Sequence, residues 1–161
     1  MWALGALKIM EPIFNNTDSK HKAVIDAYQK CAETIGKFVC SVKEKSDVTY
    51  ISKLRFRDPD LSEKEGKDHF FYLWLSQVYF HENENMLSGV FFEVPSGFEK
   101  YHKVGDRLGF DPEDVFDWMI INQDGHMNGG FTIRVTRDSF ETDLEKSKYD
   151  EYIGIKSYEP I

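Results

Sequence analysis

The spacing of apolar residues changes once along the chain, from a helical repeat to a strand repeat. Between Ser19 and about Ser41 apolar side chains recur every three or four positions, and charged side chains occupy the opposite side. This spacing predicts one amphipathic helix with a single buried stripe. The stripe consists of Val24, Ala27, Tyr28, Cys31, Ile35, Phe38 and Val39. From Val48 onward the repeat shortens to two, which is typical of strands.

Several segments after this helix have the alternation or the flanking turn residues of strands. They are Val48–Arg57, His69–Phe80, Met86–Val94, Arg107–Phe110, Trp118–Asn122 and Met127–Thr136. The second is apolar on both faces, which predicts a central strand covered on both sides. In the last, Phe131, Ile133 and Val135 are expected to face inward and Thr132, Arg134 and Thr136 outward. The polar stretch 61–68 predicts a loop, and 111–114 a single helical turn opened by Asp-Pro.

A helix followed by strands joined as hairpins predicts an α+β fold. We expect an N-terminal amphipathic helix packed on a curved, mostly antiparallel sheet, with a short C-terminal helix near Phe140 and Leu144. Residues 1–17 are expected to form a loosely ordered lead-in, with Met10 as the natural start. Residues 18–137 are expected to form one α+β domain, and 138–161 an acidic, partly helical C-terminal extension.

Composition and charge narrow the classes of function. With 161 residues, 41% of them hydrophobic and 30% charged, the chain is a globular protein of one domain. Its 28 acids against 20 bases give a net charge of −8, which disfavours binding to nucleic acids or anionic membranes and favours a basic protein partner. The sequence leaves the oligomeric state open.

Two cysteines indicate a reducing compartment. Cys31 and Cys40 lie nine residues apart in the predicted helix, so their Cα atoms are about 13 Å apart and on opposite sides. A disulfide needs a Cα separation within about 7 Å. Two unbridged thiols favour a cytoplasmic protein.

The sequence lacks the common signatures of catalysis and cofactor binding. It has no phosphate-binding loop, no GxSxG turn and no cysteine pairs with zinc spacing, so we predict no catalytic residue, no metal and no cofactor. Two clusters keep both a structural and a functional interpretation. Four carboxylates with His126 serve as caps and turns, or bind a hard cation, or form an acid/base site; they are Asp106, Asp114, Asp117 and Asp124. Lys53, Arg55 and Arg57 form a basic row on the outer face of a strand, which protects an edge or contacts phosphate or an acidic partner.

Several short motifs resemble those of the YegJ-like family of uncharacterised bacterial proteins. They are the Gly-Asp step at 105–106, Asp-Trp-Met at 117–119, Gly-Gly-Phe-Thr-Ile-Arg at 129–134 and the Gly89–Pro95 spacing. Asp68-His69 with the aromatic strand that follows resembles the family's acid-His-x-Trp segment, and either His69 or Trp74 occupies the matching position. The family has no established activity to transfer, and its resemblance implies accessory or immunity-type proteins.

Two hypotheses for function follow. The first is a non-enzymatic, cytoplasmic protein-binding module whose acidic surface meets a basic protein. The alternative is a small-ligand binder or enzyme with a pocket near Trp74, Asp117 and Trp118. The candidate binding residues are those at the resemblance positions that can do chemistry, namely His69, Trp74, Asp106, Asp117, Trp118 and Arg134.

Overall fold

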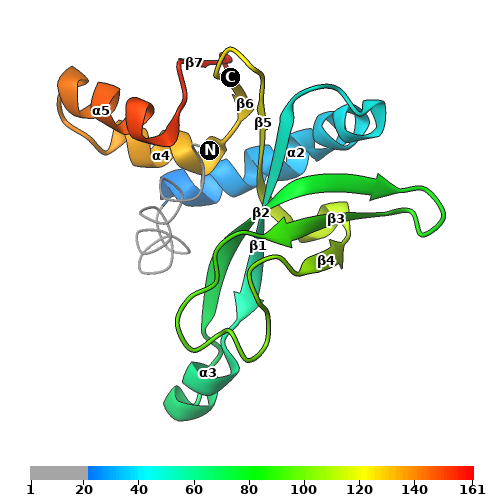
Figure 1. Ribbon diagram of the computed structural model, residues 1–161. Coiled ribbons are helices and arrows are strands. Elements are labelled where there is room, and N and C mark those ends of the chain that lie inside the picture. Colours follow the sequence, from blue (N-terminus) through cyan, green and yellow to red (C-terminus); the bar gives the residue numbers. More distant parts are fainter. Residues whose placement is uncertain (1–21) are drawn as a thin grey trace.

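The computed structural model describes residues 22–161 and confirms the α+β fold (Figure 1). One long helix, α2, packs on a seven-stranded sheet, and two further helices follow near the C-terminus. The predicted lead-in 1–17, Met10 and the first turn of the predicted helix lie outside the described residues. The strands are β1 (Thr49–Arg57), β2 (Phe70–His81), β3 (Met86–Phe91), β4 (Arg107–Phe110), β5 (Val115–Ile121), β6 (His126–Gly129) and β7 (Ser157–Tyr158).

Helix α2 (Lys22–Glu44) has the single buried stripe that its sequence predicts. Val24, Ala27, Cys31, Phe38 and Val42 are buried, and the helix contacts β5, β2 and the later helix α4 (Phe131–Asp138). Ile35 and Val39 pack against the same core but remain partly exposed. Burial of this stripe is what stabilises the helix, because an isolated helix is marginal in water.

The strands follow the order β4-β3-β2-β1-β5-β6-β7, and every neighbouring pair is antiparallel except β6 and β7. Only residues 111–114 join β4 to β5, and three of them form a 3-10 turn. In a flat sheet these two strands would lie four places and about 19 Å apart, whereas five extended residue steps reach at most about 17 Å. The sheet therefore curls strongly, and residues of β1 and β4 line one small cavity of about 330 Å³.

Two apolar cores lie on opposite faces of the curled sheet. In β2, Leu73 belongs to one core and its neighbour Trp74 to the other, as the alternation of a strand requires. The first core packs α2 and an aromatic cluster around Phe91 and Phe98. The second packs Ile51 and Trp74 against the C-terminal helices. This arrangement confirms the prediction that the central strand is covered on both sides.

The predicted strand Met127–Thr136 is wrong in its second half. Strand β6 ends at Gly129, and Phe131–Asp138 form helix α4. Gly129 and Gly130 have positive φ angles of 74° and 62°, which turn the chain out of the sheet. Thr132 and Thr136, expected to face outward, are buried.

The polar stretch predicted as a loop contains a short helix, α3 (Pro59–Glu65). Asp58 accepts a hydrogen bond from the Leu61 amide at its start, and Gly66 closes it in the left-handed conformation. The helix is polar because most of it faces water, so it has no apolar stripe to reveal it. Its signal was the Asp-Pro pair before it and the glycine after it.

The charged C-terminal part forms helix α5 (Asp143–Ile153) and then β7, which pairs in parallel with β6. Thr142 and Glu145 form a capping box at its start. Tyr149, Ile153 and Ile155 are buried in the second core, whereas Leu144 is 65% exposed. The segment after residue 138 thus contributes both a strand and core side chains.

Candidate functional site

A large hollow among the described residues begins with an irregularity in β2. Ser76 pairs with Val90 and Tyr79 with Ser88, so β2 has one more residue than β3 between these pairs. The backbone of Gln77 takes a φ of 50°, which is rare for a residue with a side chain. Such a bulge bends its strand and raises the local twist.

Beyond the bulge, β2 separates from β1. Their pairing runs from Arg57 with Phe70 to Ser52 with Leu75. On the other side of β1, pairing with β5 continues to Thr49. Within residues 22–161, Thr49–Ile51 of β1 and Ser76–His81 of β2 therefore have no ladder partner on the side where the two strands face each other. Figure 1 shows β2 and β3 extending away from β1 here.

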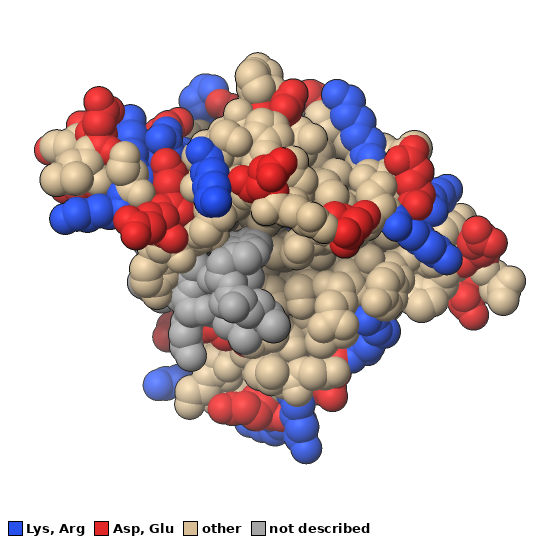
Figure 2. Space-filling model, turned by 45° about the horizontal axis from the view of Figure 1, so that its top comes forward, with Lys and Arg blue, Asp and Glu red and all other residues tan. Residues whose placement is uncertain are grey.

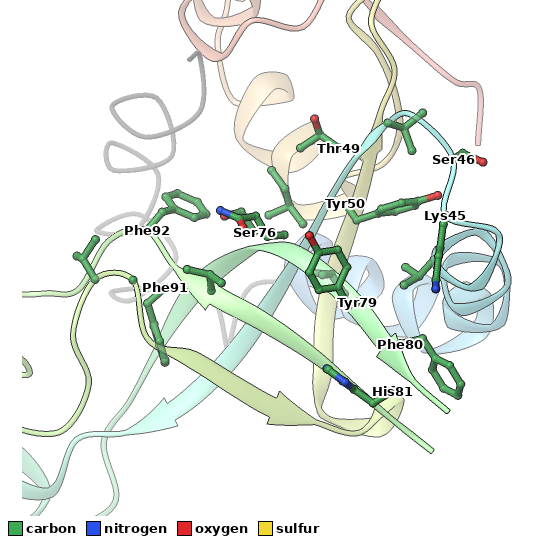
Figure 3. A pocket seen from close by; sticks show the side chains of 18 residues that line it. Lys45, Ser46, Thr49, Tyr50, Ser76, Tyr79, Phe80, His81, Phe91 and Phe92 are labelled. Carbon is green, nitrogen blue, oxygen red and sulfur yellow. The ribbon is translucent and has the colours of Figure 1, made fainter. Parts of the chain in front are cut away.

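This split between β1 and β2 holds an open groove of about 960 Å³, which we call the split groove. One wall comes from the start of β1 and the end of α2, and the other from the bulged part of β2, with β3 and the loop before β4 closing one end. Figure 3 shows Thr49 and Tyr50 on the first wall and Tyr79, Phe80 and His81 on the second. The apolar lining residues are Val42, Val48, Tyr50, Ile51, Val78, Tyr79, Phe80, Val90, Phe91, Phe92 and Val104.

Polar side chains of β2, β3 and β4 hold the bulged part of β2 in place through hydrogen bonds. Arg107 of β4 donates from Nη1 to the Gln77 carbonyl over 3.0 Å and to Ser88 Oγ over 2.8 Å. Its guanidinium lies 4.7 Å from the centre of the Tyr79 ring. His81 Nε2 is 2.6 Å from Ser88 Oγ. The carbonyl that the bulge turns out of the ladder is thus paired, which holds the bulge in place.

The pair of His81 and Ser88 has the spacing of a base and a nucleophile, but its surroundings do not suit catalysis. Ser88 is only 4% exposed. Arg107 already donates to its oxygen, so the Ser88 hydroxyl is engaged within the sheet. We assign the cluster to the support of the groove.

Close packing also maintains the bulge. A Cβ atom added to Gly89 of β3 would lie 2.8 Å from Leu75 Cβ. Only glycine lets β3 approach β2 this closely just before the bulge. The Gly89–Pro95 spacing noted in the sequence thus begins at a residue whose lack of a side chain shapes the groove.

Asp117, a predicted binding residue, is 0% exposed and is occupied by the fold. Its carboxylate accepts from the amides of Trp118, Phe131 and Thr132 and from the Thr132 hydroxyl. It therefore anchors the first turn of α4, whose amides lack partners within the helix. Burial raises the pKa of Asp117, while hydrogen bonds from Thr132 and the nearby charge of Lys53 act in the opposite direction.

Lys53 corrects the prediction of an outward basic row on β1. It is 1% exposed and pairs in register with Asp117 of β5. Its ammonium lies 5.1 to 5.6 Å from the ring centres of Tyr28, Tyr72 and Trp74 and 3.4 Å from Thr132 Oγ1. The alternation of the strand hid this burial because a charged residue on a half-apolar strand is normally assigned to the wet face.

The other predicted binding residues lie in separate surroundings. Trp74 and Trp118 are both buried but belong to different cores. Arg134 donates from Nε to the Gly129 carbonyl, and Asp106 accepts from the Lys103 amide. His69 lies between α3 and β2, where its amide donates to Ser62. None of the six lines the 960 Å³ hollow or the 330 Å³ cavity, and they stay predictions.

The residues that line the split groove were missed by the sequence analysis. They come from β1, β2, the end of α2 and a loop, and none forms a motif. The one local sign was the polar pair Ser76-Gln77 inside the apolar run of β2. Across residues 22–161 the structure has no cluster of three metal-ligating side chains and no helix long and apolar enough to cross a bilayer.

Comparison with known protein families assigns the chain to one of them. Residues 21–157 match the model of a family described as uncharacterized proteins conserved in bacteria, DUF2314. The chain belongs to the DUF2314 family. The match spans α2 to the first residue of β7, so the helix, the sheet and both C-terminal helices are parts of the DUF2314 domain. No curated protein and no solved structure matches the chain significantly.

Proposed function

We propose that this DUF2314 protein is a non-enzymatic, cytoplasmic protein-binding module of accessory or immunity type, and that the split groove binds a segment of a basic partner protein. The observation that carries the proposal is the groove itself. It is large, open and mostly apolar, and a few polar groups stand at its edge. The finer resemblance to YegJ-like proteins agrees with this interpretation.

Exposed apolar side chains at the groove support a binding role. Tyr79 is 54% exposed and Val104 is 63% exposed, and both line the groove. Exposed apolar side chains gathered at one hollow mark sites where proteins or ligands bind. Burying them on association would stabilise a complex by about 25 cal/mol per Å² of apolar area.

Charge supports a basic partner. The chain has an excess of eight negative charges. Figure 2 shows Asp and Glu side chains among Lys and Arg side chains around a mostly uncharged central area. Long-range attraction between an acidic protein and a basic one speeds their encounter and weakens as salt is added. Two free cysteines suit a reducing cytoplasm.

The test compares two variants with matched exposure. Val104→Lys places a charge in the groove, whereas Leu144→Lys places one on α5, where Leu144 is 65% exposed. Each purified protein is mixed with a lysate of the producing bacterium at low and high salt, and the retained proteins are identified by mass spectrometry. We expect a basic protein that is retained by the parent protein and by Leu144→Lys, is lost with Val104→Lys, and weakens with salt.

A different result would contradict the proposal. If no retained protein distinguishes the two variants, the split groove is not a protein-binding site. If native mass spectrometry instead shows a small molecule that is released by Val104→Lys alone, the groove belongs to a ligand-binding protein. Circular dichroism of both variants provides the control for folding, since neither substitution touches a buried side chain.

A further inference from the structure

We propose that the partner segment enters the split groove as an extended strand and pairs its backbone with the free edges of β1 and β2. This inference rests on the proposed function and adds the mode of binding. Two strand edges form the walls of one hollow: Thr49–Ile51 on β1 and Ser76–Phe80 on β2. Both edges therefore face the same hollow.

The backbone of these two edges supplies the first argument. Among residues 22–161, Thr49–Ile51 pair with β5 on one side only, so the amide and carbonyl groups on their other side point into the split. Within the same described part of the chain, Ser76–His81 pair with β3 on one side only, and the bulge interrupts even that pairing. Backbone polar groups need partners, and an extended peptide carries N–H and C=O groups at matching intervals. A helix has no free backbone groups along its length and would leave both edges unpaired.

The lining supplies the second argument. Side chains of an inserted strand alternate between two faces. One face would meet the groove residues that keep exposed apolar surface, among them Tyr79 and Val104. The other would face water. The segment that fits best therefore has apolar residues at every second position and uncharged polar residues between them, because Lys45, and no described carboxylate, lines the groove.

The bulge explains why the split does not close by itself. If β2 continued straight, its residues after Leu75 would pair with Ile51, Tyr50 and Thr49 of β1 in the existing register. The positive φ of Gln77 bends β2 away, and Arg107 holds the displaced carbonyl. Bulges of this kind end pairing next to functional sites. The free edges are short, which is how natural sheets limit unwanted pairing.

The test uses the full-length protein and a defined peptide pool. The peptides have ten residues, with Val, Ile or Phe at odd positions and Ser or Thr at even positions. Backbone hydrogen exchange is measured with and without the pool by NMR or mass spectrometry. We expect at least ten-fold slower exchange of amides within Thr49–Ile51 and Ser76–Phe80. Amides within Lys53–Arg57 should not change, because this part of β1 lies outside the split and keeps the same surroundings with and without peptide.

N-methylated peptides separate backbone pairing from side-chain contact. Two further pools carry N-methyl groups at all odd or at all even positions, which removes the donors of one strand edge and leaves the side chains in place. We expect at least one of them to bind ten-fold more weakly than the parent pool. The parent pool should bind Leu144→Lys as it binds the unchanged protein, and should bind Val104→Lys at least ten-fold more weakly.

Three outcomes would overturn strand addition. They are absence of binding by the parent pool, equal binding of all three pools, and protection of the same amides before any peptide is added. The last would mean that the chain itself or a second copy already fills the split. If a lysate protein is still lost with Val104→Lys while the pools bind equally or not at all, the groove binds protein without adding a strand. In that case the proposed function stands and this inference fails.

Discussion

Lys53 and Asp117 face each other in register across the central strands β1 and β5, and both are almost completely buried. Thr132 connects them, because its hydroxyl donates to Asp117 and lies 3.4 Å from the Lys53 ammonium. The pair thus ties the centre of the sheet to the first turn of α4. Neither residue lines the split groove or the smaller cavity, and their contacts connect parts of the fold.

Loss of the Asp117 charge is expected to destabilise the fold more than loss of the Lys53 charge. Asp117→Asn turns an amino group toward donors that need an acceptor and leaves Lys53 without its opposite charge. We expect a loss of about 3 kcal/mol in the free energy of unfolding. Lys53→Met keeps the hydrogen bonds of Asp117 and fills the same space, so its cost should be smaller. Urea unfolding measures both, and a larger cost for Lys53→Met would contradict this assignment.

Gly129 is expected to be irreplaceable at the junction of β6 and α4. An added Cβ atom would lie 2.3 Å from the Trp118 carbonyl oxygen and would also meet the indole ring. Gly129→Ala should therefore cost more than about 2 kcal/mol, because buried overpacking adds to backbone strain. Gly97→Ala is the matched control, with a positive φ but nothing within 4 Å, and should cost about 1 kcal/mol. Equal losses in thermal unfolding would argue against the steric explanation.

The bulge should tolerate glycine and reject a β-branched residue. Gln77 is exposed and holds a φ of 50°. Gln77→Gly removes the backbone strain at the cost of entropy in the unfolded state, so stability should change by less than about 1 kcal/mol. Gln77→Val should lose about 1 to 2 kcal/mol or more. If valine proves harmless in urea unfolding, the left-handed conformation at this position is not required.

The two cysteines should differ sharply in reactivity. Cys31 is fully buried, and burial raises the pKa of its thiol, whereas Cys40 is exposed. The thiolate is the reactive form, so a thiol reagent should label Cys40 in the native protein and Cys31 only after unfolding. Cys40→Ser should abolish labelling of the native protein. Rapid labelling of this variant would show that the helix opens on the time scale of the reaction.

High pH should loosen the C-terminal segment through Tyr158. Burial and a hydrogen bond to Asp150 raise the pKa of this phenol above its ordinary value. Because folding raises this pKa, the neutral phenol stabilises the folded state. This contribution is complete below the ordinary pKa near 10 and is lost as the pH rises through the pKa of the folded state. We expect faster hydrogen exchange in α5 above about pH 10. Tyr158→Phe keeps the ring beside Arg137 and should reduce this dependence on pH, and an unchanged profile would assign it to another group.

The predictions that held depend on local pattern. Helix α2 has an apolar stripe over six turns, and β1 and β2 have turn residues at their ends, so neighbouring residues alone specify them. The capping sequence at 111–114 and the Asp124-Gly125 turn are likewise local. In Phe131–Asp138 the pattern fits either a strand or a helix, and the alternation wrongly indicated a strand. Its helix depends on a carboxylate fourteen residues earlier in the chain, at Asp117.

The sequence by itself determined the class of fold, because periodicities of 3.6 and two decide which faces must be buried. Only the tertiary structure decided that Lys53 is buried, that Asp117 caps α4, and that β1 and β2 part to form the split groove. Each of these depends on groups brought together from distant parts of the chain. Such neighbours set the energy of a buried charge and of an unpaired strand edge. Their arrangement produces no periodic pattern along the sequence that could be recognised in advance.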